Sequence, residues 1–381
     1  MREVSLIDVC AIKNGYAFKS SEFKDSGTPL IRISSFNNGP VYFDNRTVYV
    51  DNQFLESKSA FKVEKGDVLI ALSGATTGKY GLYTNDKPSL LNQRVGLLKS
   101  GVSQDLDDKY FYYYLSVLQS EIFRKAGGAA QPNISTKEIS EFKIPLPPID
   151  QQKKIAAILD AADAYRQKTK ALITKYEELT QSLFLDMFGD DTGTLTELGK
   201  VIKTVGGGTP SKDNEQYWNG NIPWASVKDL KSERLTKTQD FITQSGVDNS
   251  ATRVVPNGSL IVATRMAVGR AVICEMDVAI NQDLKAIQTI GKINITYLLY
   301  LFKSKKNYFD SVSSGATVKG IKIEHITKLK VNLPNYSKQN QFADSVQAIE
   351  TQKAQAQASL LQAEYLFNSL LQRAFKGELV S

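Results

Sequence analysis

The residues that could carry out catalysis are few in this chain of 381 residues. It contains one histidine, His325, and two cysteines, Cys10 and Cys274, which lie far apart in the sequence. Zinc hydrolysis needs several clustered ligands, and a Ser-His-Asp site needs a histidine beside its nucleophile. Isolated cysteines are typical of small core residues, and we expect the lone histidine to be structural or exposed. These residues predict neither a catalytic metal centre nor an acyl-transfer site.

Two glycine-rich segments resemble nucleotide-binding loops but lack the residues that such loops require. The segment 74–79, Gly-Ala-Thr-Thr-Gly-Lys, has three residues between its glycines where a phosphate loop has four, and Tyr80 replaces the hydroxyl that would hold magnesium. The segment 206–208, Gly-Gly-Gly, is followed by Pro210, which is a poor start for the helix of a dinucleotide fold. The motifs of amino-methyl transfer and of nuclease metal sites are also missing. The sequence therefore predicts a binding protein without catalytic residues.

Polar and basic side chains instead gather on segments that read as loops. Side chains of Arg, Lys, Asn, Gln, Ser and Thr can reach base edges and phosphates of DNA. The loop 73–79 has a counterpart at 264–270, and the amides in 92–94 and 281–282 suit bidentate contact with adenine. Each segment alone also fits an ordinary surface turn, but they recur at equivalent places. The candidate DNA-binding residues are Lys19, Arg32, Ser73, Thr76, Thr77, Lys79, Asn92, Gln93, Arg94, Thr209, Ser211, Lys212, Trp224, Lys228, Arg265, Arg270, Asn281, Gln282 and Lys319.

Length and composition bound the class of protein. With 42% apolar and 23% charged residues, the chain reads as globular and long enough for two domains. The net charge of +7 suits an anionic partner such as nucleic acid, and most of the excess lies in residues 191–335. No stretch approaches the roughly 18 to 20 uncharged apolar residues of a membrane span. The start of the sequence lacks the apolar region of a signal peptide, so we expect a cytoplasmic protein.

The elements that must position these loops occur twice. The sequence from Tyr110 to Phe188 is repeated without a gap, 187 residues later, from Tyr297 to Phe375. Leu-Pro pairs at 146–147 and 333–334 fall at matching places in the two copies. A pseudo-two-fold internal repeat whose loops have diverged indicates two different ligands held on one frame. Looser matches further upstream include Gly15 with Gly207 and Asn92-Gln93 with Asn281-Gln282.

Four segments alternate along the chain, which predicts an α+β fold. Residues 1–148 and 191–335 carry short apolar runs between Gly, Asn and Asp, typical of strands, with examples at 29–33 and 66–72. Aromatic helices are predicted at 107–124, ending at Gly127-Gly128, and at 297–305. Residues 149–190 and 336–381 predict long helices. Pro145-Leu-Pro-Pro148 breaks the chain before the first of these, and Asp150 is placed to cap it.

Both long helices show apolar residues at alternating spacings of four and three, which is a heptad pattern. Such a narrow seam needs a partner helix, and the simplest arrangement is an antiparallel coiled coil of the two. Packing of each helix on its own strand-rich domain remains the alternative. The predicted seam residues are Ile158, Ala162, Tyr165, Leu172, Tyr176, Leu179 and Leu183 in the first helix, and Phe342, Val346, Ile349, Leu360, Phe367 and Leu370 in the second.

Two motifs make the chain similar to a known family. Residues 207–211, Gly-Gly-Thr-Pro-Ser, followed by 222–224, Ile-Pro-Trp, resemble the opening of a target-recognition domain. Residues 144–155, which run from Ile-Pro-Leu-Pro-Pro into a long helix, resemble the boundary of a conserved region in the same family. Over its whole length the chain is similar to the DNA specificity subunits of Type I restriction-modification systems. It departs from the pattern at 14–18, Asn-Gly-Tyr-Ala-Phe, and at the Leu-Pro-Asn-Tyr start of the second helix.

The resemblance implies two target-recognition domains, 1–148 and 191–335, that each read half of a split, asymmetric double-stranded DNA site. The helices 149–190 and 336–381 are then conserved spacers that set the unread gap and dock two methyltransferase subunits for adenine-N6 methylation. Restriction subunits with motor and nuclease activities join them. This chain would bind no metal or cofactor, because S-adenosylmethionine and ATP belong to the partner subunits. A coiled-coil scaffold with protein-binding domains is the alternative, whereas missing motifs disfavour a methyltransferase or nuclease fragment.

Overall fold

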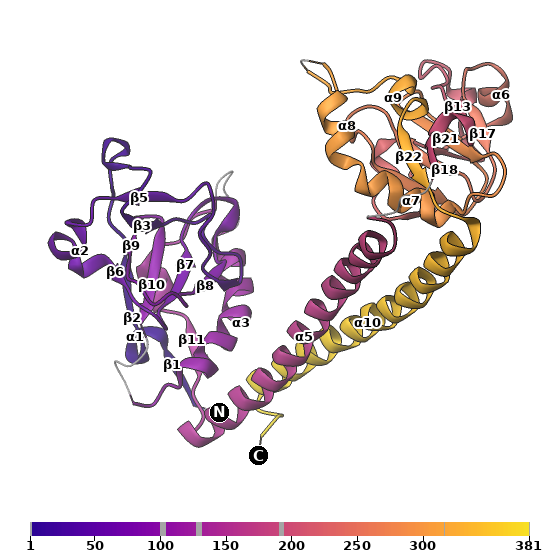
Figure 1. Cartoon of the computed structure of the whole chain (residues 1–381). Helices are drawn as coiled ribbons and strands as arrows, with labels where there is room; N and C mark the ends of the chain where they lie inside the picture. The colour runs from indigo at the N-terminus through magenta and orange to yellow at the C-terminus, as the bar shows by residue number, and fades with distance from the viewer. Residues whose placement is uncertain (1, 100–103, 127–131, 190–193, 316, 381) are drawn as a thin grey trace. The chain divides into compact units, whose positions relative to one another are not determined.

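The computed structural model describes residues 2–99, 104–126, 132–189, 194–315 and 317–380 (Figure 1). Its contacts divide the chain into two compact units: unit 1 is Met1–Thr169 with Ser359–Ser381, and unit 2 is Lys170–Ala358. Each unit therefore holds one strand-rich segment and part of both long helices. The predicted domain boundary after residue 190 and the predicted helix end at Gly127-Gly128 lie outside the described residues.

Unit 1 is built on mixed β-sheets. Its strands are β1 (Glu3–Ser5), β2 (Ala11–Asn14), β3 (Thr28–Ile31), β4 (Gly39–Pro40), β5 (Val48–Val50), β6 (Lys62–Val63), β7 (Val68–Ala71), β8 (Tyr80–Leu82), β9 (Ser89–Leu91), β10 (Val95–Lys99) and β11 (Lys143–Pro145). One sheet has the order β2-β10-β7-β8-β4, a second has the order β5-β3-β9-β6, and β1 pairs with β11. The pairs β3–β9 and β4–β8 are parallel and the others antiparallel.

The core of unit 1 lies on both faces of β7. Val68 and Ile70 pack with the aromatic helix, whereas Leu69 and Ala71 pack with the second sheet. This alternation follows from the two-residue period of a strand, and it produces a helix–sheet–sheet layering. The helices of unit 1 are α1 (Leu6–Val9), α2 (Phe54–Ser57), α3 (Asp108–Ala126) and α4 (Thr136–Ser140), with short 3₁₀ turns η1 (Ser20–Glu22), η2 (Ser59–Phe61) and η3 (Gly74–Thr76).

Unit 2 repeats the strand order of unit 1. Its strands are β12 (Thr194–Glu197), β13 (Ile202–Gly206), β14 (Trp218–Ala225), β15 (Arg234–Leu235), β16 (Asp240–Ile242), β17 (Arg253–Val255), β18 (Leu260–Ala263), β19 (Ala271–Cys274), β20 (Val278–Ile280), β21 (Leu284–Thr289) and β22 (Lys330–Leu333). The orders β13-β21-β18-β19-β15 and β16-β14-β20-β17, and the pair β12-β22, match those of unit 1 strand for strand. The predicted internal repeat and α+β class are confirmed.

The core of unit 2 is also divided by its central strand. Leu260 and Val262 of β18 pack with helix α7, and Ile261 and Ala263 face the second sheet. The helices of this unit are α6 (Gln244–Asp248), α7 (Ile295–Ser304), α8 (Lys306–Val312) and α9 (Ile323–Thr327), with 3₁₀ turns η4 (Leu198–Lys200), η5 (Glu215–Tyr217) and η6 (Val227–Asp229).

The two long helices are α5 (Ile149–Phe188) and α10 (Tyr336–Lys376), and they lie side by side and antiparallel within each unit (Figure 1). In unit 2 the ring of Phe184 lies 5.4 Å from that of Phe342. In unit 1 the guanidinium of Arg166 lies 4.2 Å from the ring centre of Phe367. The predicted antiparallel pairing is therefore present in each unit.

The seam of α5 requires a correction. Ala162, Tyr176 and Leu183 are half-buried as predicted, but Ile158, Tyr165, Leu172 and Leu179 are 37–54% exposed. The less exposed positions lie one residue later: Leu159 and Thr180 are buried, and Arg166 and Ile173 are half-buried. In two pairs the apolar pattern favours the wrong neighbour, because the less exposed residues, Arg166 and Thr180, are polar. In the other two pairs both neighbours are apolar, so the pattern does not distinguish them. In α10, the predicted seam residues Phe342, Val346, Ile349, Leu360, Phe367 and Leu370 are buried or half-buried.

The starts of the two long helices also differ from the prediction. Helix α5 begins at Ile149, so Asp150 lies inside the first turn and does not cap it. Its carboxylate still suits the positive end of the helix dipole. Helix α10 has a side-chain cap, because the Oδ1 atom of Asn335 accepts a hydrogen bond of 2.8 Å from the Lys338 amide.

Candidate nucleic-acid interface

In both units a glycine passes beneath the turn that carries the candidate amides. A Cβ atom on Gly15 would lie 2.1 Å from the carbonyl oxygen of Asn92. A Cβ atom on Gly207 would lie 2.1 Å from the carbonyl oxygen of Ile280. No side chain fits at either place. The close approach holds the segment after β2, or after β13, against the turn that precedes β10 or β21.

Five candidate residues of unit 1 come together at this turn. The Leu72 amide donates a hydrogen bond of 2.9 Å to the Arg94 carbonyl, which places the loop after β7 next to the turn. Ser73, Gln93 and Arg94 line a cavity of about 860 Å³. Gln93 and Arg94 also line a neighbouring cavity of about 260 Å³, together with Arg32 and Asn92. A concave surface with guanidinium and amide groups fits the recognition of base edges.

Other candidates in unit 1 support the loop. Asn92 is 7% exposed, and Thr77 is 2% exposed. The Thr77 hydroxyl lies 2.7 Å from the Gly74 carbonyl and 2.9 Å from the Pro132 carbonyl. These two side chains are less suited to base contact than the sequence suggested, because the fold buries them. The cavity linings include neither Lys19 nor Lys79.

Two hydroxyls of the same loop stand out by their surroundings. The Oγ atom of Ser73 and the Oγ1 atom of Thr76 are buried, and neither has a hydrogen-bond partner among the described residues. Buried polar groups are usually paired, so an unpaired one marks a place where a partner is missing.

In unit 2 the loop after β18 presents a restrained arginine. Thr264 donates hydrogen bonds from its amide (2.8 Å) and its hydroxyl (3.0 Å) to the Asp283 carbonyl, so loop and turn are joined as in unit 1. The Arg265 guanidinium lies 3.6 Å from the Asp283 carboxylate, and its side chain is 57% exposed. The Arg270 guanidinium instead donates a hydrogen bond of 3.2 Å to the Leu230 carbonyl. Arg265 is therefore better placed than Arg270 to contact a ligand.

The remaining candidates of unit 2 fall into two groups. Trp224 and Asn281 are 5% and 6% exposed; Trp224 donates from Nε1 to the Gly208 carbonyl (3.2 Å), and Asn281 accepts from the Asp283 amide (3.1 Å). Both support the fold of the site. The more accessible candidates are Thr209, whose hydroxyl bonds to Gln282, together with Ser211, Lys212, Lys228 and Lys319.

One of these lysines has a perturbed ionisation. The Lys228 ammonium lies 2.6 Å from the Asp240 carboxylate. This hydrogen bond raises the pKa of Lys228 above its ordinary value, so the side chain stays charged. A charged lysine at the surface fits contact with phosphate.

The two units carry the arginine of the candidate site on different segments: unit 1 on the turn, and unit 2 on the loop beside it. Arg94 and Asp283 are equivalent, because each accepts a hydrogen bond from the residue after the central strand. Ser73 and Arg265 are the next residues along their loops. Unit 1 therefore has serine on the loop and arginine on the turn, whereas unit 2 has arginine on the loop and a carboxylate on the turn. The frame is shared, but the chemistry that it presents is different.

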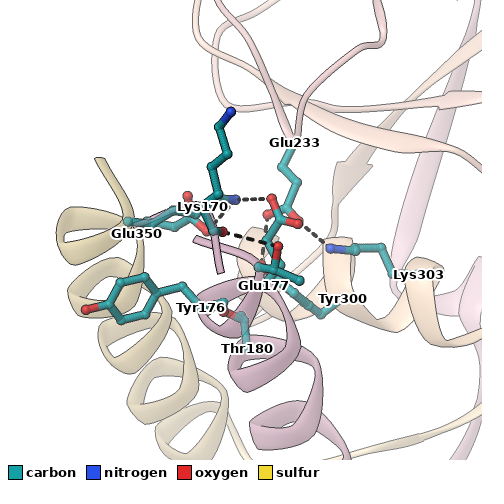
Figure 2. A network of polar contacts seen from close by, with 10 residues as sticks. Lys170, Tyr176, Glu177, Thr180, Glu233, Tyr300, Lys303 and Glu350 are labelled. Atoms are coloured by element: carbon teal, nitrogen blue, oxygen red, sulfur yellow. Dashed lines mark hydrogen bonds and ion pairs between the residues drawn. The ribbon is translucent and has the colours of Figure 1, made fainter. Parts of the chain in front are cut away.

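A polar network that the sequence did not reveal joins α5 and α10 to the sheet side of unit 2 (Figure 2). Glu233, in the loop before β15, pairs with Lys303 and accepts a hydrogen bond of 2.8 Å from Tyr300. Lys353 of α10 lies 3.1 Å from Glu177 of α5 and 3.7 Å from Glu350. Burial raises the pKa of Glu233, but Lys303, Tyr300 and Lys353 outweigh it, so the pKa lies below its ordinary value.

A buried glutamine attaches each long helix to its unit. Gln152 accepts a hydrogen bond of 2.9 Å from the Asp107 amide and donates to the Asp105 and Pro147 carbonyls. Gln339, 187 residues later, accepts a bond of 2.9 Å from the Asn294 amide and donates to the Pro334 carbonyl. Both are fully buried. The sequence held one signal for these anchors: both glutamines lie at the same position of the repeat, after the Leu-Pro pairs.

The cysteine and histidine side chains that were candidates for catalysis lie in places that fit a structural role. Burial and the nearby Asp108 raise the pKa of the Cys10 thiol to about 12, which suppresses the thiolate. His325 lies in α9, where its Nδ1 atom is 3.4 Å from the Lys322 amide. Within the described ranges, no group of three or more His, Cys, Asp or Glu side chains could hold a metal ion. None of the helices in those ranges has the length and apolar character needed to cross a membrane.

The duplicated fold, with an equivalent loop and turn in each unit, defines a class of protein with two similar domains. Comparisons with known sequences show which family this is. The chain belongs to the family of Type I restriction modification DNA specificity domains, whose model matches residues 1–180 and 191–362. It is 28% identical over 262 residues to the EcoR124I/EcoR124II specificity subunit of Escherichia coli, covering 64% of this chain and 63% of that subunit. The chain thus aligns with less than two thirds of that relative.

Other relatives match over more of the length. The EcoBI specificity subunit of Escherichia coli is 25% identical over 423 residues, which covers 99% of this chain and 86% of the relative. Two solved structures share the fold. One, from work on assembly and conformational transition of the type I R-M system, has a TM-score of 0.64 at 16% identity, covering 99% of this chain and 98% of its own. The S subunit from M. genitalium has a TM-score of 0.54 at 17% identity, with 98% and 96% covered.

Proposed function

We propose that this chain is the sequence-reading subunit of a Type I restriction-modification complex and recognises a bipartite, asymmetric DNA site. The strand-rich segment of each unit reads one half-site. The single observation that carries the proposal is that equivalent loops present different groups, Ser73 with Arg94 and Arg265 with Asp283, on one fold. Two unlike readers on a common frame suit a site with two unlike halves.

The long helices dock methyltransferase subunits in this proposal. Ile158 and Tyr165 in unit 1, and Leu172 and Leu179 in unit 2, are each one heptad apart, which places each pair on one face of its part of α5. Their exposure of 37–54% leaves an apolar stripe on a helix. Exposed apolar stripes of this kind mark surfaces that bind partner proteins.

The catalytic work and its cofactors belong to the partners. Two methyltransferase subunits supply S-adenosylmethionine and methylate adenine at N6, and restriction subunits supply ATP-driven translocation and cleavage. This chain contributes the choice of sequence. It needs no cofactor for that role, because hydrogen bonds and apolar contacts alone read the base edges.

The deciding experiment is co-expression of the chain with its cognate methyltransferase subunit, followed by mapping of methylated adenines in the host genome. A bipartite motif, two short specified sequences separated by an unspecified gap, is the expected result. Methylation at a continuous motif, or none that depends on this chain, would contradict the proposal.

The docking surface has its own test. Leu172→Glu places a charge in the apolar stripe and should reduce co-purification of the methyltransferase subunit. Gln181→Glu adds the same charge at an exposed polar position of α5 and serves as the matched control. Equal co-purification of both variants would remove the stripe from the interface.

The spacer role is tested by inserting one heptad into both α5 and α10. Seven residues lengthen a helix by about 10 Å, or roughly three base pairs of DNA. The gap between the methylated half-sites should grow accordingly. An unchanged gap would contradict the role of the helices as a ruler.

Salt dependence separates the proposal from a protein-binding scaffold. DNA binding through phosphate contacts releases counterions, so the affinity for duplex DNA should fall steeply as the salt concentration rises. A scaffold that binds protein through its globular parts would show no such DNA affinity. The purified complex and a duplex containing the mapped motif suffice for this measurement.

A further inference from the structure

Met266 occupies an unusual place in the loop after β18, which is the proposed recognition loop of unit 2. Its side chain is 66% exposed, and its backbone has a φ of +64°. Bulky residues rarely adopt this left-handed conformation, which glycine enters freely. The equivalent residue of unit 1 is Gly74, with a φ of +80°. Unit 2 therefore carries a large apolar side chain where the fold would be more easily satisfied by glycine.

The backbone around Met266 is held from two sides. Its amide donates a hydrogen bond of 3.1 Å to the Lys319 carbonyl, and Arg265 pairs with Gly320 in an antiparallel bridge. The Ile321 amide also donates a bond of 2.9 Å to the Thr264 carbonyl. The conformation of the loop is therefore fixed before any ligand arrives. A residue kept in an unfavourable conformation by its surroundings indicates a function for that side chain.

The surroundings of Met266 are cationic. Arg265 precedes it in the chain, with a guanidinium that is 57% exposed and is held near Asp283. Lys319 is exposed on the segment that accepts the Met266 hydrogen bond. An apolar protein partner gains little from such neighbours, whereas DNA offers phosphates to the cations and apolar groups on its bases. The thymine C5-methyl group in the major groove is the apolar mark that a side chain of this kind reads.

We propose that Met266 is a specificity-determining residue that packs against a thymine methyl group in the half-site read by unit 2, an inference that rests on the proposed DNA recognition. Arg265, oriented by Asp283, contacts a neighbouring base edge. Unit 1 has no such reader at the equivalent place, because Gly74 carries no side chain. The two half-sites therefore differ in whether this position is read by apolar contact.

The test replaces the side chain without disturbing the backbone. Met266→Gly removes the apolar group and suits a φ of +64°, so the variant should fold at least as well as the parent in a thermal unfolding measurement. Leu195→Ala, at a site 62% exposed in the same unit, is the matched control. Each variant is expressed with the methyltransferase subunit, and methylated adenines are mapped.

For Met266→Gly we expect one thymine of the unit 2 half-site to lose its requirement, with methylation of parental sites falling by roughly 5- to 100-fold. The other half-site and the Leu195→Ala variant should be unchanged. Binding supplies a second readout: replacing that thymine by uracil should weaken the parent complex but leave the variant indifferent. An unchanged motif together with equal binding of both DNAs would overturn the proposal.

Two other outcomes would also overturn it. Loss of methyltransferase co-purification by Met266→Gly would assign the side chain to a protein contact. A rise in fluorescence of 2-aminopurine placed in the half-site, without any effect of uracil, would assign it to insertion between base pairs. Absence of a bipartite motif in the parent complex would count against the proposed function itself, so the two failures are distinguishable.

Discussion

Arg166 and Lys353 occupy the same position of the internal repeat, yet they stabilise the helix pair by different means. Each has an acidic residue three positions earlier, Asp163 or Glu350, and pairs with it. Arg166 then lies over the ring of Phe367, whereas Lys353 crosses to Glu177. The cation at this position is common to both units. Its partner on the other helix is apolar in unit 1 and ionic in unit 2.

The difference shows which part of the repeat is constrained. Phe367 of α10 and Thr180 of α5 are themselves equivalent positions, and both are buried. In unit 1 a ring fills this position, and in unit 2 a small hydroxyl leaves room for the network around Glu233 (Figure 2). The buried position is therefore the same in both units, but the side chain that fills it and its contacts differ. The loops after β7 and β18 show the same behaviour, with Ser73 in the first and Arg265 in the second.

The largest expected effect distinguishes these two equivalent positions. Phe367→Ala should destabilise unit 1 by about 3–5 kcal/mol, because it removes a buried ring that contacts Tyr113 and Arg166. Thr180→Ala should cost unit 2 only about 1 kcal/mol, since it removes one hydroxyl bonded to the Tyr176 carbonyl. Hydrogen exchange of peptides from α3 and α7 in the full-length chain would measure both. Similar losses would show that the two seams do not differ in the way described.

The shared anchors should behave alike. Gln152→Leu and Gln339→Leu each remove the side-chain partner of a partly buried backbone amide and of a buried proline carbonyl, so each should cost about 1–3 kcal/mol. Urea unfolding monitored by hydrogen exchange of each unit is the measurement. Gln347→Leu, at an exposed position of α10, controls for the added leucine. A much larger effect in one unit would contradict the equivalence of the anchors.

The recognition loops should differ in DNA binding. Arg94→Ala and Arg265→Ala should each weaken binding of the complex to its site by about 1–3 kcal/mol, and each should relax a different half-site. Arg270→Ala should have a smaller effect, because its guanidinium bonds to the Leu230 carbonyl. Titration of labelled duplexes altered in one half-site would report both quantities. If both variants lost sequence specificity in the same half-site, the assignment of one half-site to each unit would be wrong.

The smallest effect concerns pH. The pKa of Glu233 lies below its ordinary value of 4.5, so its carboxylate stabilises unit 2 above that pH and the contribution is lost as pH falls through the lower folded pKa. Glu233→Gln should remove less than about 1 kcal/mol at neutral pH. It should also flatten the decline of unit 2 stability below about pH 4.5. Parallel acid curves for parent and variant would show that Glu233 does not contribute.

Much of the fold could be predicted because the repeat contains the same information twice. The order of segments and the aromatic helices follow from patterns that both copies share. The seam of α5 could not be placed, because an apolar heptad pattern prefers Leu179 to Thr180 and does not distinguish Ile158 from Leu159. The Thr180 hydroxyl bonds to the Tyr176 carbonyl one turn earlier, so the helix itself satisfies this polar group. Which face of α5 is covered depends on packing with residues distant in sequence.

The candidate site could be predicted only at the level of loops. Residue type does not show whether an amide faces solvent or closes its own turn, so Asn92 and Asn281 looked equal to Gln93 and Gln282. The fold separates them, with the asparagines buried and the glutamines exposed. The strained backbone of Met266 was equally invisible, because φ is a property of the folded chain.

The rings at the end of α10 have a consequence for synthesis on the ribosome. Phe367 and Phe375 pack against Tyr110, Tyr113 and Tyr114, which are translated about 250 residues earlier. At ~5–20 residues per second, α3 waits on the order of tens of seconds for these partners. All residues of unit 2 are synthesised before Phe367 and Phe375. The part of the protein that is made first is therefore the last to complete its core, and its aromatic surface is exposed to chaperones and proteases in the interval.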